Sequence, residues 1–359
     1  MNKAFRLVAL TTVLAAPFVP RDASACGGTF CDGGPNQMNV DQTGENILFV
    51  MDGSTVEAHI QIQYNGNNAA RFAWVLPVQK SPTGTPITIG VGSQTLFANL
   101  LAGTVPSYGY TTQSTCAPPN GAAGAGGSSS GAGGSSGKGG AGGGGPTVTQ
   151  KGTAGAFEYV VLDGGTAAEV MQWLADNQYQ QVPEAEPLLG EYLAKDYQFV
   201  AVKLVNGAGL DEIHPLTVKY DGSTPCVPIK LTRIAATENM AIRTFFLGSG
   251  RVVPTNYRHV ELNEARIDWR QLGNNYGSVV NGGMDAPVAN GQAFATEYAG
   301  PSNVVSQSGV WSAAWDASPF PALTPEKVID ELKKQSLAFC GGGVCTYNHP
   351  LIAGLLHEF

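Results

Sequence analysis

The sequence predicts an α+β fold, with mainly antiparallel sheet, a few packed helices and a long disordered Gly-rich loop. Strand patterns and helix patterns come in runs rather than in strict alternation, which favours antiparallel sheets over a parallel α/β arrangement. Gly accounts for 47 of the 359 residues, and charged residues make up only 13% of the chain, about half of the ~25% usual in soluble proteins. This composition is typical of a neutral, loop-rich protein that contains β-sheet.

The first third of the chain has the pattern of antiparallel strands followed by a helix. Val56–Tyr64 alternates apolar and polar residues, as a strand with one buried and one solvated face does. The apolar run Ile47–Met51 precedes this strand, and Arg71–Val78 returns after a turn. Thr95–Leu101 has the character of a short helix.

A tract of Gly, Ser and Ala covers Asn120–Gly145 and carries a single charge, Lys138. Such a tract cannot bury enough apolar surface to offset the entropy lost on ordering, so we expect it to be disordered. The predicted division of the chain is a signal peptide at 1–25, a β-rich part at 26–118, a loop or linker at 119–150 and an α+β part at 151–359. One integrated domain over 26–359 is the alternative.

The part after this tract mixes helices with strands. Thr166 and Glu169 have the spacing of a capping box, which predicts the start of a helix. Further helices are predicted from Pro183 through Leu188–Lys195, near Asn263–Leu272 and from Thr324-Pro325 onward. Strands are predicted at Phe157–Leu162, Phe199–Val205, Leu216–Tyr220, Ile229–Ile234 and Met240–Leu247.

The N-terminus has the pattern of a secretory signal. Lys3 and Arg6 precede the apolar run Leu7–Ala16, and a small-x-small cleavage pattern ends at Ala25. The mature chain is therefore expected to begin at Cys26. A cysteine at this point leaves open a lipid anchor at Cys26, as an alternative to ordinary cleavage.

Charge and hydropathy narrow the classes of partner. The formal net charge is −8 and the chain has no basic run, so we do not expect it to bind nucleic acid. After the signal, no apolar run approaches the ~20 residues of a transmembrane segment. We expect an extracytoplasmic protein that is periplasmic, secreted or tethered to the envelope by a lipid, with an unknown partner.

Six cysteines follow the predicted cleavage point, at Cys26, Cys31, Cys116, Cys226, Cys340 and Cys345. An even number of cysteines in an exported protein indicates disulfides. A zinc site made from the motifs ACGGTFC and FCGGGVC is one alternative. A redox centre is another, although the sequence lacks Cys-x-x-Cys. Each motif can close on itself or the two can pair with each other, and Cys116 and Cys226 then form the remaining pair.

The histidines are the candidate bases of an enzyme. His59 shares the polar face of its strand with Glu57, whereas His214 and His259 fall in loop-like segments. For all three, a solvated strand face or a loop is the simpler interpretation. Patterns such as HExxH and GxSxG are absent. The sequence therefore assigns no catalytic, cofactor-binding or metal-binding residue, and we expect no cofactor.

The favoured hypothesis is an exported, non-catalytic protein of the cell envelope or extracytoplasmic space, with a binding or structural role. The alternative is a secreted hydrolase whose catalytic site is assembled from distant segments, with His59, His214 or His259 as the base. Catalytic residues need not be adjacent in sequence, so this alternative stays open.

A family resemblance adds to these expectations. ACGGTFC, the following VDQTGENILFVMDG, and then AHIQIQYNG and FAWVLPV resemble the start of the DUF2330 family. YLAKDYQFVAVKL, PIKLTRIAA and FATEYAGPS resemble its second half, so the resemblance runs from Cys26 to about Ser302. It implies an exported bacterial protein without an established activity, cofactor or catalytic residue. The family pattern does not require the Gly-rich tract, which indicates an inserted loop.

Overall fold

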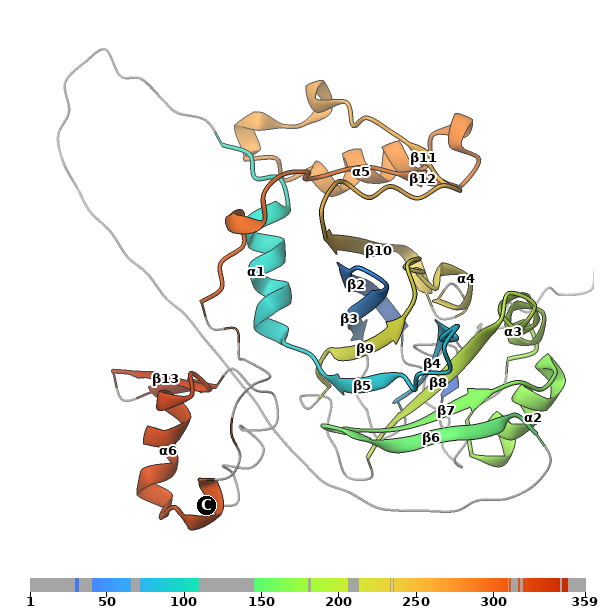
Figure 1. The fold of residues 1–359 in the computed structure, drawn as a ribbon. Coiled ribbons are helices and arrows are strands. Elements are labelled where there is room, and N and C mark those ends of the chain that lie inside the picture. The colour runs from blue at the N-terminus through green and yellow to red at the C-terminus, as the bar shows by residue number, and fades with distance from the viewer. Residues whose placement is uncertain are drawn as a thin grey trace, which may run out of the picture.

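The structure is a computed structural model. It describes residues 30–31, 41–65, 72–109, 145–179, 182–205, 213–232, 234, 236–308, 310, 316, 319–342 and 344–347. These residues form helices and mostly antiparallel strands, which confirms the predicted α+β class (Figure 1). The predicted signal peptide and the Gly-rich tract up to residue 144 lie outside the described residues.

Two five-stranded sheets form the body of the protein. Sheet 1 is antiparallel throughout and contains, in spatial order, β1 (Phe30–Cys31), β4 (Phe72–Gln79), β8 (Tyr197–Leu204), β7 (Phe157–Asp163) and β6 (Thr147–Ala154). Sheet 2 contains β10 (Ala236–Leu247), β2 (Asp41–Asp52), β3 (Thr55–Asn65), β9 (Leu216–Asp221) and β5 (Thr88–Val91). In sheet 2, β10 pairs with β2 in parallel, and the other neighbours pair antiparallel.

The two sheets pack face to face around one apolar core. Phe49 and Val218 of sheet 2 belong to the same buried cluster as Trp74 and Val200 of sheet 1, and burial of this apolar surface is the main source of stability. Both sheets contain strands from before and from after the Gly-rich tract. The parts of the chain on the two sides of that tract therefore share one core.

The alternation predicted for β3 places its apolar side chains in this core. Val56, Ala58 and Ile60 are buried there, as expected from the period of two. The opposite face differs from the prediction of a solvated surface, because the side chains of Glu57 and His59 are only 35% and 16% exposed.

Helices α2 and α3 cover the outer face of sheet 1. The capping box predicted at the start of α2 (Ala167–Asp176) is present, with reciprocal hydrogen bonds between Thr166 and Glu169. The predicted second helix is α3 (Ala185–Leu193). Both helices pack into a buried cluster with Phe199 of β8.

Helix α1 (Gln94–Thr104) covers the outer face of sheet 2. Its Phe97 and Leu100 are buried against Leu48 of β2. Ser93 accepts a hydrogen bond from the Leu96 N–H and so caps the helix. Across the described parts of the chain, no helix is both long enough and apolar enough to span a membrane.

Three predictions of secondary structure need correction. The strand predicted at Ile229–Ile234 is wrong, because Ile229–Thr232 form the short helix α4. The Leu231 and Thr232 N–H groups bond to the Pro228 carbonyl, and the fixed φ of proline favours such a start over extended backbone. The loop predicted over 119–150 ends earlier than expected, because β6 begins at Thr147. The helix near Asn263–Leu272 is replaced by two 3-10 turns, η2 (Glu264–Arg266) and η3 (Trp269–Gln271).

The segment after β10 lies beyond the end of that strand (Figure 1). It contains β11 (Arg258–His259), η2, η3, α5 (Tyr276–Met284), η4 (Pro287–Ala289), β12 (Ala293–Phe294) and η5 (Ser302–Val304). The Tyr276 hydroxyl donates to Glu297 at 2.7 Å, and the Glu297 carboxylate lies 3.6 Å from the Arg243 guanidinium of β10. These contacts fasten the segment to sheet 2.

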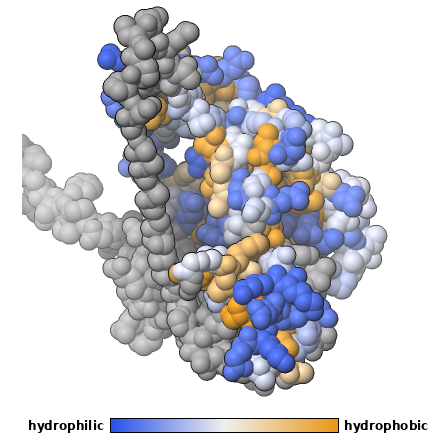
Figure 2. Space-filling view, turned by 90° about the vertical axis from the view of Figure 1, so that its left-hand side faces the viewer, coloured by the Kyte–Doolittle hydropathy of each residue, from blue (hydrophilic) through white to orange (hydrophobic). Residues whose placement is uncertain are grey.

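The last described segment, which we call the C-terminal unit, covers 319–347. It contains η6 (Phe320–Ala322), the predicted last helix α6 (Pro325–Lys334) and a hairpin of β13 (Ala338–Gly341) and β14 (Val344–Tyr347). Leu332 and Leu337 form a small apolar cluster of its own. The opposite, charged side of α6 gives the hydrophilic region at the bottom of Figure 2.

Candidate functional site

His214, one of the three candidate bases, is a structural residue of the core. It is 5% exposed and packs edge-on against Phe157. Its Nε2 accepts a hydrogen bond from the Ala156 N–H at 3.1 Å, and its Nδ1 lies 2.8 Å from the Pro215 carbonyl oxygen. Both ring nitrogens are therefore satisfied by backbone, and burial lowers the pKa of the imidazole. A neutral imidazole with both nitrogens engaged cannot act as a base on a substrate.

His59 pairs with Glu57, its neighbour on the same strand face. The His59 Nε2 lies 3.0 Å from the Glu57 carboxylate, and Lys219 lies 3.7 Å from the other Glu57 oxygen. Burial lowers the pKa of His59, although Glu57 opposes that shift. The buried His59 Nδ1 has no hydrogen-bond partner among the described residues.

The other histidines add little to a catalytic site. His259 is exposed on β11, where its ring contacts Phe294. His349 and His357 lie outside the described residues. The structure therefore does not bring His59, His214 and His259 together in one site.

The cysteine motif near the C-terminus closes on itself. Cys340 and Cys345 form a disulfide with a Cα–Cα distance of 4.0 Å, across the paired strands of the β13–β14 hairpin. This bond confirms a disulfide in the chain and selects local closure for this motif. It also takes both thiols away from the alternative zinc site. In the part of the chain that the structure describes, no three His, Cys, Asp or Glu side chains group closely enough to hold a metal ion.

Cys226 carries a free thiol in the described part of the chain. Burial raises the pKa of this thiol, which disfavours the reactive thiolate. Its predicted partner Cys116, together with Cys26, lies outside the described residues, and of Cys31 only the backbone is described. The pairing of these cysteines stays a prediction.

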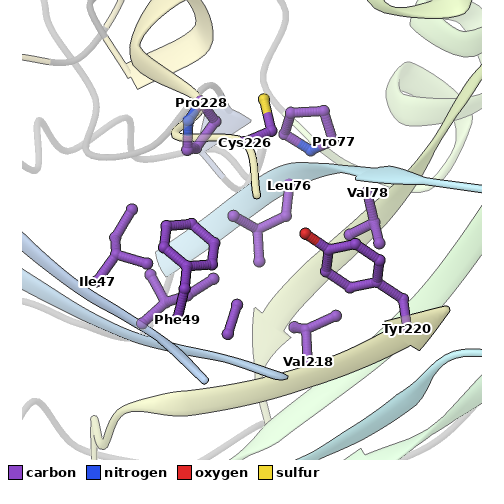
Figure 3. Close-up of a pocket in the computed structure, with 11 residues that line it drawn as sticks. Ile47, Phe49, Leu76, Pro77, Val78, Val218, Tyr220, Cys226 and Pro228 are labelled. Carbon is purple, nitrogen blue, oxygen red and sulfur yellow. The ribbon is translucent and has the colours of Figure 1, made fainter. Parts of the chain in front are cut away.

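A first cavity lies between the two sheets, and Cys226 stands at its edge. Figure 3 shows the Cys226 sulfur between Pro77 and Pro228, while the Tyr220 hydroxyl points among apolar side chains. The cavity measures about 20 Å³, which is room for about one water molecule. It is a packing defect of the core and cannot hold an organic ligand.

A second cavity is large enough for a ligand and is here called the β10 cavity. It measures about 350 Å³, within the range of small-molecule sites. It lies between α4, β10 and α5, and its lining residues are Ile229, Thr232, Ala236, Thr237, Asn239, Met240, Ile242, Asn281, Met284 and Asp285. Half of this lining is apolar and half is polar, and it comes from three separate segments of the chain.

An irregularity in β10 shapes this cavity. Between Ala236 and Ala241 the strand bulges, so that this stretch lies opposite only Gln42–Gly44 of β2. Asn239, within the bulge, has a positive φ of 60°, a conformation that asparagine adopts more readily than most residues. The bulge moves these residues out of the ladder and into the cavity wall. Bulges of this kind are frequent beside functional sites.

A buried polar cluster, which we call the Glu45 cluster, lies directly behind one wall of the β10 cavity. Gln42, Glu45 and Thr232 are 0%, 1% and 2% exposed. The Thr232 hydroxyl donates to Glu45 Oε2 at 3.0 Å, and Gln42 Nε2 lies 3.5 Å from the same oxygen. Thr232 lines the cavity, and so does Ile242, the cross-strand neighbour of Glu45. One side chain therefore separates the Glu45 carboxyl from the cavity.

Glu45 holds a proton under mild conditions. Burial raises its pKa to about 7, against the opposing hydrogen bonds from Thr232 and Gln42. Glu45 Oε1 and Gln42 Oε1 are buried acceptors without a partner among the described residues. A proton on Glu45 converts one of these acceptors into a donor. A carboxyl group poised near neutral pH beside a cavity is typical of a functional site.

Sequence motifs do not reveal Glu45, because its local sequence, Asp41–Asn46, has the polarity of a surface turn. A bulge between Gln42 and Gly44 lets side chains three positions apart, at Gln42 and Glu45, both turn inward. The available signal is Glu45 itself, two positions before the apolar run Ile47–Met51, but alternation alone cannot locate a bulge.

A comparison with protein-family models gives a match that covers most of the chain. Comparisons with curated proteins and with solved structures find no match. Residues 20–317 match a family described as an uncharacterized protein conserved in bacteria, DUF2330. The match includes both sheets, the β10 cavity and the Glu45 cluster, and it ends before the C-terminal unit. The chain therefore belongs to the DUF2330 family.

Proposed function

We propose that this protein is exported and acts outside the cytoplasm by binding a small ligand in the β10 cavity, without catalysis. The observation that carries the proposal is the cavity of about 350 Å³ backed by the buried Glu45 cluster. A volume of this size falls within the range of small-molecule sites.

Two features support the extracytoplasmic part of the proposal. The N-terminal charge and hydropathy pattern is that of a secretory signal ending at Ala25. The Cys340–Cys345 disulfide suits an oxidising compartment, since disulfides are rare in reducing cytosol.

The cost of the Glu45 cluster supports the binding part. A buried carboxyl and a buried carboxamide whose oxygens have no partner in the described part of the chain destabilise a fold, so their presence behind a cavity favours a role in that cavity. Binding is preferred to catalysis there because the Thr232 hydroxyl is almost fully buried and is already engaged with Glu45.

A fragment screen by saturation-transfer NMR tests the site. Ala236 lines the cavity, so Ala236→Trp should fill it and abolish the signals of fragments that bind the wild-type chain. Ala168→Trp on the exposed face of α2 is the matched control and should leave them intact. Fragments that bind all three proteins equally would place binding elsewhere and refute the site.

A reporter fusion tests export. Residues 1–40 fused to alkaline phosphatase, which is active only outside the cytoplasm, should give activity, and replacing Lys3 and Arg6 by Glu should reduce it. The mass of the N-terminal peptide of the full chain then distinguishes a free Cys26 from a lipid-anchored one. An inactive fusion and an uncleaved N-terminus would contradict export.

A hydrolase is the second candidate, and the His59–Glu57 pair is the observation that favours it. A base oriented by a carboxylate, with its second nitrogen unpartnered among the described residues, is two parts of a nucleophile–base–orienter arrangement. Neither cavity described above is lined by His59. This candidate predicts p-nitrophenyl ester hydrolysis that His59→Asn abolishes and the exposed His259→Asn preserves.

A further inference from the structure

We propose that the ligand of the β10 cavity is a small organic ammonium ion, and that its binding expels the proton from the Glu45 carboxyl. This inference rests on the proposed binding function and names the chemistry of its ligand. It follows from the charge of the lining, from the division of the lining into polar and apolar residues, and from the position of the Glu45 cluster.

The charge of the lining selects a cation. Asp285, at the C-cap of α5, is the one acidic residue among the ten that line the cavity, and none of the ten is basic. A cation entering the cavity gains the attraction of the Asp285 carboxylate, whereas an anion meets repulsion without a compensating partner. The lining thus discriminates by charge before any contact is made.

The remaining lining residues fit an ammonium group with a hydrocarbon portion. The carboxamide oxygens of Asn239 and Asn281 and the Thr237 hydroxyl can accept ammonium N–H bonds. The Asn281 Nδ2 and Asn239 Oδ1 atoms are 3.5 Å apart across the cavity wall, at the limit of a hydrogen bond. A ligand that bonds to both amides therefore breaks only this one weak hydrogen bond between them. The apolar residues of the same cavity, which suit alkyl groups, are Ile229, Ala236, Met240, Ile242 and Met284.

The Glu45 carboxyl responds to such a cation through one side chain. Thr232 lines the cavity, and its hydroxyl donates to Glu45 Oε2 at 3.0 Å. A positive charge in the cavity stabilises the carboxylate form of Glu45, because opposite charges attract across the buried Thr232 side chain. Glu45 then loses its proton to solvent, and the ligand enters with its ammonium charge unchanged. The Thr232 hydrogen bond becomes charge-assisted and strengthens.

The other titratable groups near Glu45 do not release the proton when the cation binds. Tyr192 of α3 is buried, and burial raises the pKa of its phenol, so it stays neutral. Lys230 of α4 forms an ion pair with Glu191 of α3. Arg243 lies on the opposite face of β10 from Ile242, where it pairs with Glu297. Asp285 faces the ligand from α5 and is already counted in the lining.

Three probes with the same chain length test the ligand class. They are n-butylammonium, n-butanol and butyrate, each titrated calorimetrically into the full chain in two buffers of different ionisation enthalpy. We expect binding of n-butylammonium alone, with release of about half a proton or more per ligand near pH 6.5. The affinity should rise about tenfold between pH 6 and pH 8, over which range the alkylammonium stays charged.

Two variants identify the groups. Glu45→Gln should still bind n-butylammonium but lose both the proton release and the pH dependence. Asp285→Asn should weaken binding about tenfold. The matched control is Asp330→Asn on the exposed side of α6, which should change neither quantity.

The outcomes separate this inference from the proposed function. If n-butanol or butyrate binds as tightly as n-butylammonium, the ammonium class is overturned, although a binding function stands. Binding without proton release, or release that persists in Glu45→Gln, overturns the role of Glu45. If no probe binds while the fragment screen finds cavity ligands, the ammonium inference fails and the proposed function survives. If the fragment screen also finds no cavity ligand, both the ammonium inference and the proposed function are refuted.

Discussion

The turn region around His214 and the β2–β10 edge around Glu45 both bury a titratable side chain, but they treat it in opposite ways. Around His214 the backbone supplies a partner for each ring nitrogen, at Ala156 and at Pro215. Around Glu45 one carboxyl oxygen and the neighbouring Gln42 Oε1 are left without a partner among the described residues. The difference indicates that the first group serves the fold, whereas the second is retained at a cost to the fold.

The stability contributions of the two regions also change in opposite directions with pH. Burial lowers the pKa of His214 and raises that of Glu45. The unfolded chain therefore binds more protons at His214 in acid, so stability falls as the pH drops below the unfolded value. At Glu45 the folded chain holds the extra proton, so stability falls as the pH rises from the unfolded value of 4.5 toward 7.

Removing the satisfied group should have the largest effect. His214→Ala deletes a packed ring and leaves the buried Ala156 N–H without its acceptor, and we expect a loss of about 4 kcal/mol in the free energy of unfolding. Urea unfolding at pH 7.5 measures it. His259→Ala, on the exposed β11, is the control and should stay within about 0.5 kcal/mol. Equal losses in both variants would remove the structural role of His214.

Adding a β-carbon at Gly155, next to His214, should lower the free energy of unfolding slightly less than removing the His214 ring. Gly155 has a positive φ of 62°, and a β-carbon added there would overlap His214 Nε2. We expect Gly155→Ala to lose about 3 kcal/mol in urea unfolding, from backbone strain together with displacement of the imidazole. Gly164→Ala is the control, because Gly164 also has a positive φ but no neighbouring atom. The two losses should differ, and identical values would show that His214 is free to move.

Neutralising Glu45 permanently should stabilise the protein, and only at higher pH. Below pH 4.5 the wild-type and Glu45→Gln chains should unfold with similar free energies. Between pH 4.5 and 7 the free energy of unfolding of the wild type should fall below that of the variant. By pH 8 the variant should be more stable by about 3 kcal/mol. Urea titrations across pH 4–8 measure the difference. The same exchange at the exposed Glu238 of β10 is the control. A constant difference across the range would contradict the burial of a titrating carboxyl.

Removing one partner of Glu45 should have the smallest effect. Thr232→Val keeps the shape but deletes the hydroxyl that donates to Glu45, so the pKa of Glu45 should rise further. We expect a loss of about 2 kcal/mol at pH 8, where the acceptor is charged, and about 1 kcal/mol at pH 5. Thr237→Val is the matched control, since its hydroxyl bonds to the neutral Gln42 carbonyl. Its loss should not change with pH, and the same pH dependence there would break the assignment.

Elements that depend on their own residues were predictable from the sequence. The alternation of Val56–Tyr64 identified β3, and the spacing of Thr166 and Glu169 identified the start of α2. Elements with weak local signals were not. The strand β6 has the sequence TVTQKGTA, which lacks apolar alternation, and α5 contains three glycines, so their structure comes from the partners they pack against. At α4, the β-branched residues outweighed the Pro228 signal in the prediction.

The candidate site could not be predicted from the sequence, because it depends on the pairing of strands that are far apart in the chain. Glu45 becomes buried only when β10 lies beside β2 and α4 covers it, and the Thr232 that contacts it is 187 positions away. Histidines and cysteines are candidates from the sequence alone, because their reactivity is evident from the residue type. A carboxyl group acquires its interest from burial, which no local pattern around Glu45 predicts.

That distant pairing also bears on the order of folding. The β2–β3 and β6–β7 hairpins join neighbouring segments, whereas β10 must return to β2 after most of both sheets has been translated. Closing so long a loop costs the most chain entropy, so we expect β10 to dock late. Until it does, Glu45 remains hydrated and ionised. Proton uptake by the chain should therefore coincide with the final step of folding and report directly on completion of the cavity.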